Sequence, residues 1–294
     1  MQYDAIVVGG SFAGLSAAMQ LARGRLKVCV IDAGKPRNRF AEHSHGFFGM
    51  DGAPPLEMIA QGREKVLAYP NVNLIAGEAL TVTGADGAFE LELASGERVN
   101  GRKLVLAYGI IDRLPEIPGL QERWGKTVLH CPYCHGYEFG GRALGVLATG
   151  AMASHQAQLI PEWGPTTFFL NDQPEPDAET LQKLAARGVV IERERVVGVE
   201  GEATVKLADG RKVELAGLYL GPRAELASSL HAQLGCELDA GPMGPILRAN
   251  DKRETTVPGV FAAGDIARLF SNATLASADG VMAAGGVHFS LVFG

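Results

Sequence analysis

Two cysteines separated by two residues are the side chains in this sequence most suited to chemistry. They stand in the segment His130-Cys131-Pro132-Tyr133-Cys134-His135-Gly136. A pair at this spacing can close a disulfide and reopen it, and its first thiol often has a lowered pKa, so that thiolate is available near neutral pH. Such a pair needs a partner that supplies or removes electrons. The segment therefore predicts a redox-active dithiol.

Three other interpretations of this segment stay open. The cysteines could ligate zinc together with His130 and His135, although the loop is short and the sequence has no second Cys-x-x-Cys pair. They could form a purely structural disulfide, although the cytosol usually keeps thiols reduced. His135 has the ordinary pKa of a group that moves protons near neutral pH, but a packed or capping residue is the alternative.

A glycine turn near the start of the chain predicts a nucleotide site. Ala5–Val8 is a short apolar run typical of a buried parallel strand, and Gly9-Gly10-Ser11-Phe12-Ala13-Gly14 follows it. A helical stretch, Leu15–Ala22, and a second strand, Val28–Ile31, lead to Asp32. This order places a pyrophosphate on a helix N-terminus and a ribose hydroxyl on a carboxylate.

Individual positions of the turn fit that role. Gly9 permits the tight turn, and Gly14 allows the helix to approach the sheet. Ser11 stands where a glycine is usual, but its side chain is small and its hydroxyl can donate to a phosphate. We therefore expect the turn to bind a dinucleotide rather than to be a structural turn alone.

Two later segments complete the predicted nucleotide site. Pro258–Ala263 reads as a buried strand that runs into Gly264-Asp265, where a carboxylate can address a polyol chain. Between the first glycine turn and this segment, Lys103–Leu106 reads as a further strand that ends in the glycine turn Ala107-Tyr108-Gly109. A chain that returns at this turn can cover the nucleotide.

The composition narrows the class of protein. The 294 residues are enough for one large or two ordinary domains. The net charge is −6 and there is no basic tract, so nucleic acid is not an expected partner. No run reaches about 18 unbroken apolar residues, and Ala5–Ala22 has no basic stretch before it, so we expect neither a membrane span nor a signal peptide. The prediction is a cytoplasmic protein.

Together these segments resemble the low-molecular-weight thioredoxin reductase family of flavoproteins, from Tyr3 to about Phe289. The resemblance implies an α/β fold of two Rossmann-like three-layer domains, the second inserted in the first. The FAD-binding domain would comprise residues 1–115 and 222–294, and the dithiol domain, similar to a pyridine-nucleotide domain, residues 116–221. It also implies a homodimer. The residues expected to hold FAD are Gly9, Ser11, Gly14, Asp32, Asn38, His45, Ala107, Gly109, Gly264 and Asp265.

In the resembling family the second cysteine, here Cys134, lies against the flavin, and Cys131 would exchange with the outside substrate. His135 would move the proton, with His130 and His45 as weaker candidates. The reductases commonly have aspartate at the position of His135. The motif Cys-x-x-Cys-His-Gly-Tyr-Glu is more similar to the gliotoxin- and holomycin-type dithiol oxidases, which leaves the direction of electron flow open.

The second nucleotide site departs from the expected pattern. Leu144–Leu147 and Ala153–Ile160 read as its strand and helix, but the turn between them, Ala148-Thr149-Gly150-Ala151-Met152, begins with alanine. The following strand ends in Asn171-Asp172-Gln173-Pro174-Glu175, which is acidic where a 2′-phosphate needs arginine or lysine. Asp172 could instead accept a hydrogen bond from a ribose 2′-hydroxyl and favour NADH. The sequence leaves two outcomes open: use of NADH or weak use of NADPH, and no use of a pyridine nucleotide.

The remaining pattern concerns how the domains are joined. Alternating segments at Val72–Thr83 and Phe89–Val99 predict a small antiparallel layer on the parallel sheet. Leu114–Pro118 and Gly221-Pro222 read as paired crossings, where a hinge would let the dithiol face the flavin in one state and its partner in another. Ala273–Ser290 is helix-like, and we expect its start to lie against the isoalloxazine ring.

The first functional hypothesis is an FAD-dependent thiol–disulfide oxidoreductase without a metal. Its substrate would be a thioredoxin-like protein or a small disulfide or dithiol. One alternative is a dithiol oxidase that passes electrons to oxygen. The other is a non-catalytic flavin redox sensor whose dithiol controls a partner.

Overall fold

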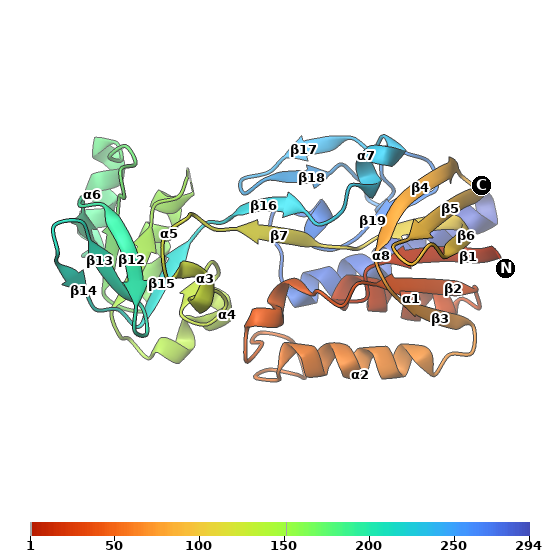
Figure 1. The fold of residues 1–294 in the computed structure, drawn as a ribbon, viewed down its shortest axis with the longest axis horizontal. Coiled ribbons are helices and arrows are strands. Elements are labelled where there is room, and N and C mark those ends of the chain that lie inside the picture. Colours follow the sequence, from red (N-terminus) through yellow and green to blue (C-terminus); the bar gives the residue numbers. More distant parts are fainter. Residues whose placement is uncertain (1, 151) are drawn as a thin grey trace.

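The computed structural model describes residues 2–150 and 152–294, which form two units joined by a pair of strands (Figure 1). Met1 and Ala151, a residue of the predicted second glycine turn, lie outside the described residues. One unit, here the nucleotide unit, contains both ends of the described chain. The other, the dithiol unit, spans residues 120–220. Each unit is built on a parallel sheet, so the α/β fold class is confirmed.

The parallel sheet of the nucleotide unit has the order β3-β2-β1-β6-β19. Its strands are β1 (Gln2–Val8), β2 (Val28–Asp32), β3 (Val72–Ala76), β6 (Arg98–Leu106) and β19 (Val260–Ala262). The residues Ala5 to Val8 of β1 are buried because helices cover one face and a second β layer covers the other. Parallel strands with continuous apolar runs are therefore the form that this sequence favours.

Strand β6 belongs to two layers. Its end, from Leu104 to Leu106, pairs in parallel with β19, whereas its start, from Arg98 to Gly101, pairs antiparallel with β5 (Ala88–Leu93). β5 in turn pairs with β4 (Ala79–Ala85). This antiparallel layer was predicted, but Val72–Thr83 was wrongly assigned to it as one segment. Val72–Ala76 is the parallel edge strand β3, because alternation marks any half-exposed strand and does not reveal its direction.

Helices pack on the other face of this sheet. α1 (Phe12–Arg23) lies between β1 and α8 (Ala273–Phe293), and α2 (Pro55–Leu67) covers the edge near β3 (Figure 1). α1 and α8 approach so closely that a Cβ atom on Gly280 would lie 2.1 Å from the carbonyl oxygen of Ala13. The small residues of both helices make this contact possible. A short helix, α7 (Leu230–Leu234), and the hairpin of β17 (Leu238–Ala240) and β18 (Pro245–Leu247) complete the unit.

The dithiol unit has a five-stranded parallel sheet in the order β11-β10-β9-β15-β8. A three-stranded antiparallel sheet, β12-β13-β14, packs beside it around a second apolar cluster. The strands are β8 (Val128–Leu129), β9 (Leu144–Leu147), β10 (Thr166–Phe169), β11 (Val190–Glu192), β12 (Val196–Glu200), β13 (Thr204–Leu207), β14 (Lys212–Val213) and β15 (Gly217–Leu220). Its helices are α3 (Leu120–Arg123), α4 (Pro132–His135), α5 (Ala153–Leu159) and α6 (Ala178–Ala186).

The two units are connected by β7 (Ile110–Arg113) and β16 (Arg223–Leu226), which pair antiparallel along their whole length. In Figure 1 they form the bridge between the two halves of the molecule. Both connections are therefore held in one ladder, and one cannot move without the other.

Helix α8 carries a fully buried carboxylate. The side chain of Asp279 is 0% exposed; it accepts a hydrogen bond from Arg268 Nη2 at 2.8 Å and forms an ion pair with Arg253 Nη2 at 2.9 Å. By length and composition α8 is the one helix among residues 2–150 and 152–294 that could cross a membrane, which is weak evidence because a core helix meets the same criteria. Here its inner face packs on α1, and the ion pairs tie it to the loops on either side of β19.

Replacing Asp279 with asparagine keeps the shape of the side chain and leaves both arginines without a counter-charge. We expect the free energy of unfolding to fall by about 3 kcal/mol, because breaking a buried ion pair from one side is costly. Urea denaturation followed by circular dichroism measures this loss. The matched control is Glu179→Gln, whose exposed pair with Lys183 should contribute less than about 1 kcal/mol. Equal losses in the two variants would contradict the assignment.

Candidate redox site between the two units

A cavity of about 420 Å³ lies where the two units meet. One wall is formed by the carboxyl ends of β1, β2, β6 and β19, which end at the same edge of the parallel sheet. The opposite wall includes Leu129 to Cys131, Cys134 and His135 of the dithiol unit. The predicted site residues on this cavity are Gly9, Ser11, Asp32, Asn38, His45, Ala107, Gly109, Cys131, Cys134, His135, Gly264 and Asp265.

The two cysteines are joined as a disulfide that opens into this cavity. Their Cα atoms are 5.5 Å apart, within the range of ordinary disulfides. Cys131 precedes the single turn of α4, and Cys134 lies within it, so the spacing of two residues places both sulfurs on one side. Both residues are half-buried. The disulfide is therefore reachable from the cavity that also holds the glycine turn.

The glycine turn needs its glycines. Gly9 has a φ of +113°, and a Cβ atom there would lie 2.2 Å from the carbonyl oxygen of Ala107. Gly14 does not itself line the cavity, and a Cβ atom on it would lie 1.8 Å from the carbonyl oxygen of Gly9. These contacts bring the N-terminus of α1 close to the ends of the strands. The Ser11 hydroxyl does not cap that helix, and its first turn carries no acidic residue, so its positive end can attract a phosphate.

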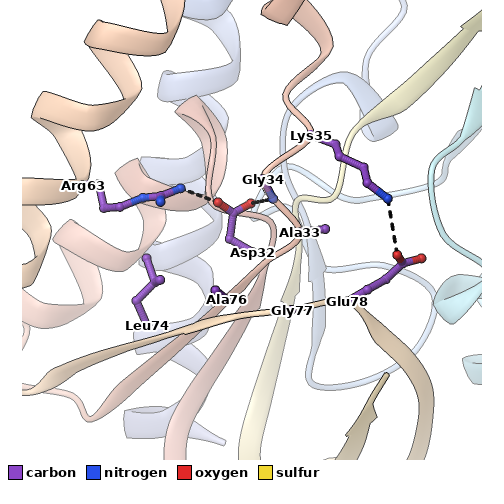
Figure 2. A pocket seen from close by; sticks show the side chains of 9 residues that line it. All are labelled: Asp32, Ala33, Gly34, Lys35, Arg63, Leu74, Ala76, Gly77 and Glu78. Atoms are coloured by element: carbon purple, nitrogen blue, oxygen red, sulfur yellow. Dashed lines mark hydrogen bonds and ion pairs between the residues drawn. The ribbon is translucent and has the colours of Figure 1, made fainter. Parts of the chain in front are cut away.

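Asp32 lies at the end of β2 as predicted, but it already has partners. Its Oδ1 accepts hydrogen bonds from the amides of Gly10 at 3.1 Å and Gly34 at 3.2 Å. Figure 2 shows Arg63 of α2 pointing at the other carboxylate oxygen, an ion pair that the sequence did not reveal. A second cavity, of about 330 Å³, lies beside this pair and extends along residues 33–35 and 76–78. A ribose hydroxyl would share Asp32 with these donors.

Asp265 belongs to a buried ionic cluster that sequence reasoning missed. Nη1 of Arg37 donates to Asp265 Oδ2 at 3.0 Å and to Ser271 Oγ at 3.2 Å. The same guanidinium donates to both carboxylate oxygens of Asp112, at 2.8 and 2.7 Å. Arg37 and Asp112 are 75 positions apart in the sequence, and no pattern of spacing links them. They were absent from the predicted site residues, although Arg37 also lines the cavity.

The middle element of the nucleotide site has one unexpected side chain. Ala107 and Gly109 line the cavity with their neighbours, but the hydroxyl of Tyr108 lies 3.1 Å from Nδ1 of His231. The ring packs against the core of the nucleotide unit. Burial raises the pKa of Tyr108, so it stays protonated. Tyr108 lines the cavity between Ala107 and Gly109, and its hydroxyl is engaged by His231.

Histidines from both units surround the disulfide. The rings of His45 and His135 meet edge to face with centroids 6.2 Å apart, and Nε2 of His45 lies 3.5 Å from a carboxylate oxygen of Glu138. Burial lowers the pKa of His135, and the neighbouring His45 lowers it further. His135 is therefore neutral near pH 7 and able to accept a proton. His43 also lines the cavity.

His130 is the most strongly perturbed of these histidines. Burial, together with the positive charge of Arg37, lowers its pKa to about 3. Its backbone carbonyl accepts a hydrogen bond from Nε2 of Gln156 at 2.9 Å, which fixes the residue before Cys131. A neutral ring that stays neutral at physiological pH is better suited to packing beside the disulfide than to proton transfer.

The residues on the cavity fit FAD. The uncapped N-terminus of α1 suits a pyrophosphate, and Asp32 with Arg63 suits the adenosine end. Asp265 lines the cavity from the turn after β19, and its carboxylate could accept from a polyol chain. The start of α8, at Ala273 and Ala276, lines the same cavity. The small side chains there leave room for a ring.

The second nucleotide turn lacks several of these features. Thr149 Oγ1 donates to the carbonyl of Gly221 at 2.6 Å, and Met152 precedes α5 without a capping side chain. α5 has seven residues, a short helix for stabilising a pyrophosphate. Two arginines, Arg193 and Arg195, do come near from the loop after β11. They are already paired with Glu175 and Asp172, respectively, so a 2′-phosphate would have to break those pairs.

A zinc site is not formed by the residues that the structure describes. Across residues 2–150 and 152–294 there is no group of three or more histidine, cysteine or acidic side chains that could hold a metal ion. The sulfur atoms of Cys131 and Cys134 are bonded to each other instead. Cys29 and Cys236 are free and buried, and burial raises the pKa of both thiols.

Comparison with known proteins places this geometry in context. The family described as pyridine nucleotide-disulphide oxidoreductase matches residues 3–280. The thioredoxin reductase tcpT of Claviceps purpurea is 34% identical and covers 92% of this chain and 88% of its own. The thioredoxin reductase sirT of Leptosphaeria maculans is 30% identical, with 98% and 94% covered.

Two solved structures have the same arrangement of both units. An oxidoreductase from Agrobacterium tumefaciens superposes with a TM-score of 0.98 at 46% identity, covering 100% of this chain and 99% of its own. The protein HlmI superposes with a TM-score of 0.92 at 34% identity, covering 98% and 92%. A similarity that extends over the full length includes the orientation of the dithiol unit.

The lowered pKa of His130 predicts how the free energy of unfolding depends on pH. The unfolded chain protonates this residue below about pH 6.5, whereas the folded chain does so only near pH 3, so the free energy of unfolding falls as the pH drops through that window. His130→Gln should reduce the loss of stability between pH 7 and pH 4. Urea midpoints at the two pH values measure it, with the exposed His155→Gln as the control. The assignment is wrong if His130→Gln keeps the wild-type pH dependence.

Proposed function

The chain belongs to the pyridine nucleotide-disulphide oxidoreductases, among the thioredoxin reductase-like flavoproteins, and on that premise we propose that it exchanges electrons between FAD, the Cys131–Cys134 pair and a dithiol or disulfide substrate. It is an FAD-dependent disulfide oxidoreductase. The substrate class, the electron donor and the roles of single residues are the proposed part. The observation that carries the proposal is that the disulfide and the nucleotide turn open into one cavity.

Thiol–disulfide exchange accounts for the first half of the reaction. A substrate thiolate attacks the Cys131 sulfur, and Cys134 leaves as the thiolate within the cavity. The second substrate thiolate then releases Cys131, so that the substrate becomes a disulfide and the enzyme a dithiol. His135, neutral near pH 7, accepts the proton that a thiol must lose at this step. Every step is reversible, so the same residues serve reduction of a disulfide.

Bound FAD supplies a two-electron acceptor or donor for the Cys134 side of the pair. The chain would hold it through the α1 N-terminus, through Asp32 and through Asp265. Asn38 and His45 line the same cavity as the glycine turn and the disulfide, which supports a role beside the ring. Phe40, Trp124 and Leu129 line the same cavity as the histidines and would restrict water beside a bound ring.

We propose that a dithiol substrate, rather than NADPH, provides the electrons. Three features disfavour a site for NADPH. α5 is short, the second turn begins with alanine, and the arginines near Asp172 are already paired with acidic side chains. The same features favour the second candidate, a dithiol oxidase that returns its electrons to oxygen. A thioredoxin-like protein stays the alternative substrate. The domain boundaries at 115/116 and 221/222, a homodimeric state and a cytoplasmic location also stay predictions.

An anaerobic titration distinguishes the electron donors. We expect a small dithiol to bleach the flavin absorbance at stoichiometric amounts, and NADPH or NADH to bleach it at least about a hundredfold more slowly. The short α5 and the alanine that begins the second turn weaken the pyrophosphate site for both nucleotides, and the 2′-phosphate of NADPH would also have to break the arginine pairs with Glu175 and Asp172. Rapid recovery of the colour on admission of air supports the oxidase. Fast bleaching by NADPH would refute the proposed donor, and no bleaching by any dithiol would refute the function itself.

The roles of the two cysteines are tested by substitution. Cys134→Ser should abolish the long-wavelength absorbance that a thiolate gives beside an oxidised flavin, because Cys134 is the residue assigned to that contact. Cys131→Ser should preserve or strengthen it, because Cys134 is then free as a thiolate. Ultraviolet–visible spectra above pH 7 measure both. The buried Cys236→Ser serves as the control, and the reverse pattern would exchange the two assignments.

A further inference from the structure

We propose that Arg37 is a positioning residue that clamps the bridge between the two units and thereby keeps the Cys131–Cys134 pair facing the cavity. The proposal goes beyond the function proposed above and uses it only for one spectroscopic readout. It concerns the short helical turn η1 (Arg37–Phe40), which follows β2 and contacts both units.

All three nitrogens of the Arg37 guanidinium donate hydrogen bonds. Nε and Nη2 form two parallel bonds to Asp112, and Nη1 reaches Asp265 and Ser271. The side chains of Arg37, Asp112 and Asp265 are only 16%, 6% and 17% exposed. A planar fork is required for this arrangement, because an ammonium group cannot bond both oxygens of one carboxylate and reach a second carboxylate in the same plane.

Asp112 connects the ionic cluster to the strands that cross between the two units. Asp112 lies in β7, one of the two strands that cross between the units, and is paired in register with Ala224 of β16. A contact that holds Asp112 therefore holds both crossings. Asp265, the other partner, belongs to the turn after β19 in the nucleotide unit. Arg37 thus connects the bridge to the wall of the cavity.

The other end of η1, at Phe40, packs directly against the dithiol unit. Phe40 packs against the apolar cluster of that unit, which includes Trp124 and Val128. A Cβ atom on Gly125 would lie 2.7 Å from Cβ of Phe40, so the two backbones are in close contact. Just after η1, His45 approaches Glu138 at 3.5 Å. The turn η1 therefore has one end in the bridge and one end in the dithiol unit.

These contacts oppose the hinge motion that the crossing strands alone would allow. To turn the dithiol unit away, Asp112 must leave Arg37 or carry it along, and Phe40 must leave its apolar contact. Separating a buried pair leaves uncompensated charge, unlike separating an exposed one. The orientation with the disulfide over the cavity is therefore the one that the chain stabilises.

The test compares two neighbouring residues of β7 in the full chain loaded with FAD. Asp112→Asn removes the buried pair, whereas Arg113→Gln removes the exposed pair with Glu225 on the same strand and serves as the control. All variants are compared at saturating FAD, because Asp112 also lines the cavity. The ratio of facing to turned-away molecules should fall roughly tenfold in that variant, and Arg113→Gln should match the wild type.

Two readouts report that ratio. Hydrogen exchange at residues 40–45 and 125–131 should become faster in Asp112→Asn, because these segments cover each other, and small-angle scattering should show a more extended molecule. With the dithiol partly reduced, the long-wavelength absorbance of a flavin beside a thiolate should also weaken. Wild-type exchange and scattering in Asp112→Asn would overturn the clamp.

Arg37→Lys provides the second variant, since it keeps the charge and loses the fork. It should behave like Asp112→Asn in exchange and scattering, and wild-type behaviour would overturn the requirement for arginine. If Asp112→Asn does not fold, judged by circular dichroism, this variant alone decides. If the wild-type protein lacks the long-wavelength absorbance, the proposed electron path fails, while exchange and scattering still decide the clamp.

Discussion

The site depends on one geometric constraint: four parallel strands must end at the same edge while the N-terminus of α1 comes close to them. That approach is possible only because Gly9 and Gly14 have no side chains, since a Cβ atom on either would collide with backbone. The cavity, the orientation of the helix and the placement of Asp32 and Asp265 all follow from it. The dithiol unit then closes the open side of the same edge. The Cys131–Cys134 pair, although carried on a separate unit, therefore reaches the cofactor cavity through the orientation of that unit.

Much of this arrangement could be predicted from local sequence. The run Ala5–Val8, the glycine turn and Asp32 form a strand–turn–helix–strand pattern with a physical reason at each position, and the structure has that order. The spacing of Cys131 and Cys134 is equally local. The error at Val72–Thr83 has a clear cause. Alternation reports which face of a strand is exposed, whereas strand direction is set by partners elsewhere in the chain, here β2 for residues 72–76.

The parts that could not be predicted are interactions between distant residues. Arg63 with Asp32, and Arg37 with Asp112, join charges that lie 31 and 75 positions apart in the sequence, a separation that no local pattern links. The same holds for Arg193 and Arg195, which neutralise the acidic loop that the sequence alone presented as bare. Sequence therefore indicated which residues do chemistry, and the structure added which residues hold them in place.

The pairing of strand β6 affects how the chain folds during its synthesis. One half of this strand pairs with β5, a close neighbour in sequence, but the other half waits for β19, which the ribosome delivers only after residues 120–220. The segment in between has its own sheet and apolar clusters and can fold while the first sheet is still incomplete. During synthesis the edge of β6 at Leu104 to Leu106 stays unpaired, so this part of the nascent protein is exposed to aggregation.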